Sequence, residues 1–250
     1  MSVAAARRVI AVAALLSRGG LRQPMLYVAI SAVPASYFVL MWLLGGARLG
    51  RHALVGALVA FAINAGVVSL PQTALAVRWR HLDELILASP VSRRQFLTAL
   101  AVSRLVYIAP PLLVVLVVFV AVNRPAPAAM ALVMLCLIVG FTLSCTAGYA
   151  LAVRWNNPVT ISSVANMVGL LTVLLPPVYY PVSLLPPWAG WPALAVPTAS
   201  LADLTRAAAG LATPHPGRLA VELVVVVASM AFASWYVYRL EKPRLVGRNR

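Results

Sequence analysis

The chain contains six long apolar runs, and they constrain its fold more than any other feature. A helix needs about 20 mostly apolar residues to cross the hydrocarbon of a bilayer. The runs that meet this length cover about 25–46, 53–77, 97–122, 126–153, 159–180 and 219–238. Lipid offers no partners to backbone N–H and C=O groups, so such runs form helices. We therefore predict an all-α integral membrane protein with six transmembrane helices in a single domain, 1–250.

The composition supports membrane insertion. Hydrophobic residues make up 62% of the chain and charged residues 10%, whereas soluble domains contain about 45–50% and 25%. So large an apolar excess cannot be buried in one water-soluble core. The formal charge of +15 raises a nucleic-acid partner as an alternative, and the distribution of the charge decides against it.

The basic residues orient the spans. Placing the N-terminus in the cytoplasm puts 14 of the 20 Lys and Arg on inside segments and 5 outside, at Arg48, Arg51, Arg124, Arg206 and Arg218. Cytoplasmic segments of membrane proteins carry such an excess. This predicts a multi-pass protein of the cell membrane with both termini cytoplasmic. Arg104, about two turns into the third span, is expected to snorkel inward.

Two short segments on the inside are predicted to be surface helices. In residues 4–20, Arg7 and Arg18 fall on one side of the helix, which indicates an interfacial helix; an uncleaved signal anchor is the alternative. The segment 78–89 has an apolar stripe at helical spacing, formed by Trp79, Leu82, Leu85 and Ile86. Its mixed-charge face either closes a loop at the membrane or binds a soluble partner.

Polar residues within the spans have two interpretations. Asn64 and Asn166 lie near mid-depth, and Ser162, Ser163, Asn166 and Gly169 share one side of span five. They either hydrogen-bond between packed helices or line a transport path. In span four, Gly140, Ser144 and Gly148 repeat every four residues, which predicts close helix packing.

The segment after span five is rich in proline and aromatic residues. Seven prolines occur between 176 and 197, and proline disrupts a helix interior. We expect residues 181–196 to form a non-helical re-entrant hairpin at the outer boundary. Asp203 and Arg206, three residues apart, are expected to pair on a surface helix that follows it.

The chain shows no enzyme chemistry. In GGARLGRH, Arg51 and His52 replace the Lys and Ser/Thr of a phosphate loop. His52, His81 and His215 lie in predicted loops and show no metal-ligand or nucleophile–base spacing. Neither a catalytic nor a metal site is therefore predicted. An ion-coupled carrier normally needs an ionisable group at mid-membrane, but the spans hold only Arg104 and Glu222, and Glu222 can pair with Arg218.

Two stretches carry a family resemblance. LDELILASPVSRRQFL at 82–97 resembles the first inner loop of type-2 ABC exporter permeases, of the multidrug, lipid and antibiotic efflux type. The stretch from TISSVANMVGLL to LADLTRAAAG resembles their fifth span and the proline-rich turn that follows. The resemblance covers essentially the whole chain. This sequence departs from relatives where Arg78 to His81 replace glutamates before the leucine pair.

The resemblance implies a dimeric membrane subunit, paired with itself or with a homologous permease. It implies two ATPase partner subunits that hold ATP and magnesium, so this chain needs no cofactor. The implied sites are ATPase coupling at Arg80, His81, Leu82, Asp83, Glu84, Leu85 and Arg93, a substrate path at Asn64, Gln72, Ser162, Ser163, Asn166 and Gly169, and an outer gate at Tyr179, Tyr180, Trp188 and Trp191.

The implied activity is outward transport of a hydrophobic or amphipathic substrate, such as a drug, an antibiotic or a lipid, by alternating access at the dimer interface. Three alternatives remain: an ion-coupled secondary transporter, an ABC exporter of a polysaccharide or another polar polymer, and a membrane scaffold that transports nothing.

Overall fold

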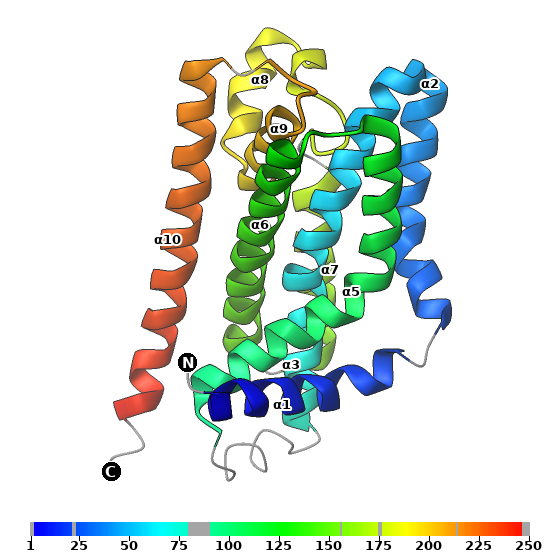
Figure 1. The fold of residues 1–250 in the computed structure, drawn as a ribbon. Coiled ribbons are helices and arrows are strands. Elements are labelled where there is room, and N and C mark those ends of the chain that lie inside the picture. The colour runs from blue at the N-terminus through cyan, green and yellow to red at the C-terminus, as the bar shows by residue number, and fades with distance from the viewer. Residues whose placement is uncertain are drawn as a thin grey trace.

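The chain folds into a bundle of helices, and the predicted all-α fold is confirmed. A computed structural model describes residues 3–21, 24–79, 91–155, 157–174, 177–213 and 215–246, and this part of the chain contains no strand. Figure 1 shows the bundle with α1 and the last part of α10 at one end and α8 at the other. We call these the α1 end and the α8 end.

α2 (Pro24–Asn64) consists of two arms. Gly45 and Gly46 depart from helical backbone angles, and Figure 1 shows the helix turning back on itself at the α8 end. Gly46 has φ +58°, a left-handed conformation that glycine adopts at little cost. The arms match the predicted first span and the beginning of the second.

A π-helical turn continues the second arm of α2. It covers η1 (Ala65–Ser69) and leads into α3 (Leu70–Trp79). The cause lies in Pro71, which has no N–H to donate to Val67 and whose ring crowds the preceding turn. Widening of the helix before a proline relieves this conflict, and the N–H of Leu70 bonds to the carbonyl of Ala65.

The middle of the chain forms three helices, α5 (Arg93–Asn123), α6 (Pro127–Arg154) and α7 (Pro158–Leu174). Ser92 and Gln95 form a capping box that starts α5. Pro110 and Pro111 lie inside α5, and Figure 1 shows its first part running obliquely beside α1 before it joins the bundle. α7 ends at Leu174, before Pro176–Pro177, so the predicted fifth span 159–180 extends beyond the helix.

The proline-rich segment is more helical than expected. It contains η2 (Val182–Leu184), α8 (Pro187–Leu194) and α9 (Pro197–Ala208), followed by α10 (Pro216–Val246). The expectation that 181–196 is non-helical was wrong, because the segment contains α8 and Pro187 stands at the first turn of that helix. At that position the missing N–H costs nothing.

α1 (Val3–Leu21) lies across the α1 end of the bundle. It packs mainly on the first part of α5, where Val9 and Ala13 contact Ala99 in a small apolar cluster. Ile10 and Leu15, on other sides of α1, are 63% and 53% exposed. A helix that runs across the bundle with apolar residues still uncovered is suited to the membrane surface.

The described helices include four segments long and apolar enough to cross a membrane, namely Ser31–Trp79, Gln95–Asn123, Pro127–Arg154 and Pro216–Arg239, and a shorter apolar helix, Pro158–Leu174. The first segment contains the turn of α2 at Gly45–Gly46, so it corresponds to the two predicted spans at 25–46 and 53–77. α7 at about 25 Å is shorter than the hydrocarbon thickness of about 30 Å.

The centre of the bundle is a contact between η1 and α6. A Cβ on Gly148 would collide with the carbonyl of Gly66, and one on Gly66 would collide with the backbone at Ser144 and Cys145. Ser144 Oγ donates to the carbonyl of Ala62 across the same contact, at 2.9 Å. The predicted packing role of Gly148 and Ser144 is therefore confirmed, and Gly140 lies against Leu201 of α9.

Replacing Gly148 by alanine should destabilise the protein, because the methyl group needs space that the Gly66 carbonyl occupies. Overpacking of this kind costs about 1–3 kcal/mol. The thermal unfolding midpoint in detergent measures the loss. Gly190→Ala is the matched control, since the nearest atom to its Cβ is 3.8 Å away, and an equal shift in both variants would contradict the packing account.

Candidate functional site

A groove between α3 and α7 brings together most of the predicted path residues. Asn64, Gln72, Asn166 and Gly169 border one cavity of about 380 Å³. Gln72 Nε2 donates a hydrogen bond to Asn166 Oδ1 at 3.4 Å. Apart from Ser69, the remaining wall residues are apolar or aromatic, and include Phe61. Amides thus line a largely hydrophobic hollow.

The groove continues towards the α1 end. A second cavity of about 470 Å³ is lined by Gln72, Trp79 and Ser162, so Gln72 borders both hollows. Ser163 borders neither cavity and is exposed on the outer side of α7. Five of the six predicted path residues therefore follow one groove, and Ser163 lies beside it.

Local structure positions these amides. The π-turn of η1 separates Asn64 from Gln72, and π-turns recur at functional sites because they redirect side chains. α7 begins where Asn157 Oδ1 accepts the N–H of Val159 at 2.9 Å. Gly169 lets α7 approach, since a Cβ there would collide with Val68.

One face of α7 is uncovered. Val159, Met167 and Leu170 are 72%, 57% and 56% exposed, and Ser163 and Asn166 share that face. The opposite face, with Ile161, Ala165, Gly169 and Val173, is buried. Asn166 thus borders the groove, where it bonds to Gln72, and it is also exposed on the uncovered face of α7.

The predicted outer-gate residues do not form one group. Tyr179 is buried and stacks on Tyr37 of α2, with ring centroids 4.4 Å apart. Trp188 and Trp191 of α8 are 80% and 63% exposed. Tyr179 also lies where a Cβ on Gly56 would collide, so its position is that of a core residue, and Tyr180 beside it is half-buried.

The predicted coupling residues lie largely outside the described residues. Arg80, His81, Leu82, Asp83, Glu84 and Leu85 fall in the gap between 79 and 91. Arg93 is the first residue of α5, directly after the Ser92 cap. At the near side of the gap, Arg78 Nη1 donates to the carbonyl of Ala152 at 2.7 Å and ties the end of α3 to α6.

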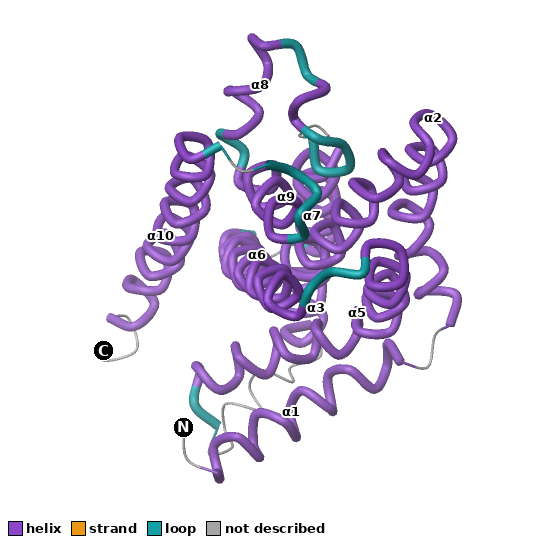
Figure 2. Tube along the Cα trace, turned by 45° about the horizontal axis from the view of Figure 1, so that its top comes forward, coloured by secondary structure: helices purple, strands orange, loops and turns teal. Residues whose placement is uncertain are grey.

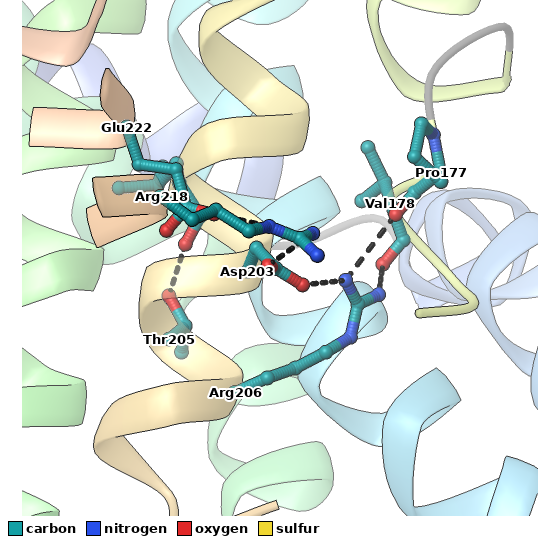
Figure 3. Close-up of polar contacts among 8 residues, drawn as sticks. Pro177, Val178, Asp203, Thr205, Arg206, Arg218 and Glu222 are labelled. Atoms are coloured by element: carbon teal, nitrogen blue, oxygen red, sulfur yellow. Dashed lines mark hydrogen bonds and ion pairs between the residues drawn. The ribbon is translucent and has the colours of Figure 1, made fainter. Parts of the chain in front are cut away.

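A charged cluster at the α8 end was only partly predicted. Asp203 of α9 pairs with Arg206 at 3.6 Å, and Glu222 of α10 pairs with Arg218 at 3.0 Å, as expected from their spacing. Arg218 Nη2 also lies 2.6 Å from Asp203 Oδ2. Figure 3 shows the side chains meeting between the two helices. This ion pair between α9 and α10 joins residues fifteen positions apart, so the helical spacing of the sequence could not predict it.

α9 is buried, contrary to the expectation of a surface helix. Figure 2 shows it in the middle of the bundle with α6, α8 and α10 around it. Arg206 is fully buried and donates to the carbonyls of Pro177 and Val178. Burial lowers the pKa of Arg206 to about 10, against the opposing effect of Asp203, so it stays charged at neutral pH. The small residues of α9 were the sequence signal of its close packing; they are Ala199, Ser200, Ala202 and Thr205.

Arg104 was expected to snorkel to the membrane surface, but it does not. It is 7% exposed, with Nη1 donating to Ser69 Oγ at 3.2 Å and Nη2 to the carbonyl of Leu16 at 3.4 Å. Its guanidinium also lies over the ring of Tyr107. Partners within the protein remove the need to reach water, so Arg104 links α5 to η1 and α1.

The described residues contain no group of three or more His, Cys, Asp and Glu side chains placed to hold a metal ion. The fold and groove define a polytopic α-helical membrane protein whose polar residues line a hydrophobic hollow. Residues 15–209 match the family model of the ABC-2 type transporter, and the chain belongs to this family. No curated protein matches it.

Membership makes the chain a permease subunit of an ABC transporter. The family is the membrane component of such transporters and does not itself hydrolyse ATP. It functions with an ATPase partner in a membrane.

Replacing Arg206 by methionine should loosen the α8 end. The change leaves the carbonyls of Pro177 and Val178 without their donor, and removing one partner of a buried ion pair costs about 3–5 kcal/mol. Hydrogen exchange followed by mass spectrometry should show faster exchange at 178–185 and a lower unfolding midpoint. Arg51→Met removes an exposed charge as the control. Unchanged exchange in Arg206→Met would contradict this role.

Proposed function

We propose that the chain is the permease subunit of an ATP-driven exporter that moves a hydrophobic or amphipathic substrate outward by alternating access between two permease copies. Family membership supplies the class of transporter. The observation that carries the proposal is the uncovered face of α7, which holds Asn166 beside the groove.

An amide on a lipid-facing surface is unfavourable, because acyl chains offer it no hydrogen-bond partner. Among the described residues, Asn166 bonds to Gln72, and a side-chain amide has four hydrogen-bonding positions. The remaining positions are best satisfied if this face meets a second permease copy or the substrate. The apolar residues around it, Val159, Met167 and Leu170, favour the same arrangement.

The chemistry of the groove supports the substrate class. Phe61, Tyr107 and Leu170 border the first cavity together with the two asparagines, and none of the described residues that border either cavity carries a charge. Pockets of this kind bind largely apolar ligands and use a few polar groups to orient them. A polysaccharide would require many more hydrogen-bonding groups along such a path.

The α1 end is proposed as the cytoplasmic side. Figure 1 shows α1, the end of α6 and the last part of α10 at this end. These segments carry Arg7, Arg8, Arg154 and Arg239, and cytoplasmic segments carry such a basic excess. The segment 78–89 and α1 would then meet the ATPase partner, which holds ATP and magnesium. α1 packs on α5. Arg104 of α5 donates hydrogen bonds both to Leu16 of α1 and to Ser69 of η1, which borders the groove. A movement of α1 could therefore be transmitted through Arg104 to the groove wall.

The ion pairs disfavour the ion-coupled alternative. Glu222 is 1% exposed and is held by Arg218, and Asp203 is held by Arg218 and Arg206. Neither acid borders the α3–α7 groove. A carrier driven by protons or sodium needs an ionisable group on its substrate path, and the described walls of this groove hold no carboxylate, histidine, lysine or arginine.

The double variant Asp83→Arg with Glu84→Arg should uncouple ATP hydrolysis from export. Reversing both charges opposes the contact with the partner subunit, while the spans remain unaltered. ATPase activity of the purified complex and substrate export from cells expressing it measure the two functions. The matched control is Arg51→Glu with Arg124→Glu, which reverses two exposed charges away from the α1 end. Unchanged export in the Asp83–Glu84 variant would contradict the coupling assignment.

Asn166→Leu should alter substrate preference more than assembly. Leucine keeps the size of the side chain and removes the amide that faces the groove, so amphipathic substrates should lose several-fold in export relative to purely apolar ones. Competition between candidate compounds in an export assay measures the preference. Thr142→Val, on the exposed side of α6, is the control. Loss of expression with no change in preference would instead support a packing role.

A further inference from the structure

A separate cavity lies at the α8 end, away from the α3–α7 groove. Its volume is about 410 Å³, and α2, α9, α10 and the segments around η2 and before α10 line it. Small-molecule sites occupy about 300–1,000 Å³, so the hollow is large enough for a polar group of several atoms. In contrast to the groove, its walls carry charged residues and imidazoles.

Four charged side chains border this cavity, Arg48, Arg218, Asp203 and Glu222, and a fifth, Arg206, lies behind its wall against Asp203. Its two carboxylates, Asp203 and Glu222, are bound by Arg206 and Arg218, so the two acids and these two arginines balance each other. Arg48 also borders the cavity and is exposed. One positive charge is therefore in surplus, which favours an anion over an amine.

His52 supplies an independent indication of a ligand. It borders the same cavity, one turn after Arg48 on α2, and it is only 7% exposed. Its Nδ1 is buried and has no hydrogen-bond partner among the described residues. A buried polar atom without a partner is costly, and a bound group in the cavity would remove this cost.

We propose that this cavity binds a phosphate-type anion, either the phosphate of a lipid headgroup or free phosphate, between Arg48 and His52. A guanidinium matches the geometry of phosphate oxygens, and an imidazole N–H can donate to the same group. The hydroxyls of Ser183 and Thr213 and the imidazole of His215 border the cavity and offer further donors. Exposed Trp188 and Trp191 on neighbouring α8 suit the headgroup layer, where lipid phosphates are available.

Binding to the full chain, purified in a neutral detergent, tests the proposal. Dihexanoyl phosphatidylglycerol and inorganic phosphate are titrated separately, and dihexanoyl glycerol serves as the probe with the same chains and no phosphate. Arg48→Gln should weaken binding at least tenfold. Arg51→Gln removes the same charge three residues away, outside the cavity lining, and should change affinity less than twofold. His52→Asn should behave like Arg48→Gln, with the unfolding midpoint showing that it is folded.

The outcomes separate the two sources. Saturable binding of the lipid alone identifies a headgroup site, and binding of inorganic phosphate identifies a site for the free anion; both support the proposal. Equal losses in Arg48→Gln and Arg51→Gln would show a general electrostatic attraction and overturn it. Equal affinity for dihexanoyl glycerol, or no saturable binding of either phosphate probe, would overturn it as well.

Discussion

The structure depends on one constraint: lipid provides no hydrogen-bond partners, so polar groups in the spans must find them within the protein. Ser144 bonds to the backbone of α2 across the contact of η1 with α6. Arg104 bonds to Ser69 and Leu16, and Arg206 bonds to the turn after α7. Each of these bonds joins separate segments of the chain, so satisfying polar groups and assembling the bundle are the same process.

At each of the two proposed sites, a polar side chain lacks part of its hydrogen bonding among the described residues. Asn166 has a partner on one side and an uncovered helix face on the other. His52 is buried, and its Nδ1 has no hydrogen-bond partner among the described residues. It lies beside a charged cluster in which Arg48, Arg206 and Arg218 outnumber Asp203 and Glu222 by one. The first feature lies in the proposed substrate groove, and the second lies at the α8 end. The sites therefore do not share residues and can be tested separately.

Apolar runs and small-residue spacing predicted much of the fold. Gly148 and Ser144 were correctly placed in a close helix contact, and the pairs Asp203–Arg206 and Glu222–Arg218 followed from helical periodicity. Burial of α9 could not be predicted from its hydrophobicity, because its buried residues are mainly small and polar. Tyr179 and Trp188 are both aromatic residues of the same proline-rich segment, so the sequence does not show which one is buried. The tertiary fold decides this by stacking Tyr37 on Tyr179.

The path residues were predicted from a resemblance and from residue type, and the fold brought five of them to one groove. Ser163 lies outside the groove, because neighbouring side chains on a helix point about 100° apart. Only Ser162 therefore faces α3. The π-turn that separates Asn64 from Gln72 was foreseeable in part from Pro71, although its register depends on the packing of Gly66 against α6.

The central claim is that this chain forms a membrane path worked by a separate ATPase. Native mass spectrometry of the tagged chain, extracted gently from its own membrane, measures the composition of the complex directly. The account predicts two permease chains, identical or homologous, together with two copies of a soluble subunit that hydrolyses ATP. A homogeneous monomer without any ATPase subunit, still able to transport its substrate after reconstitution, would contradict it.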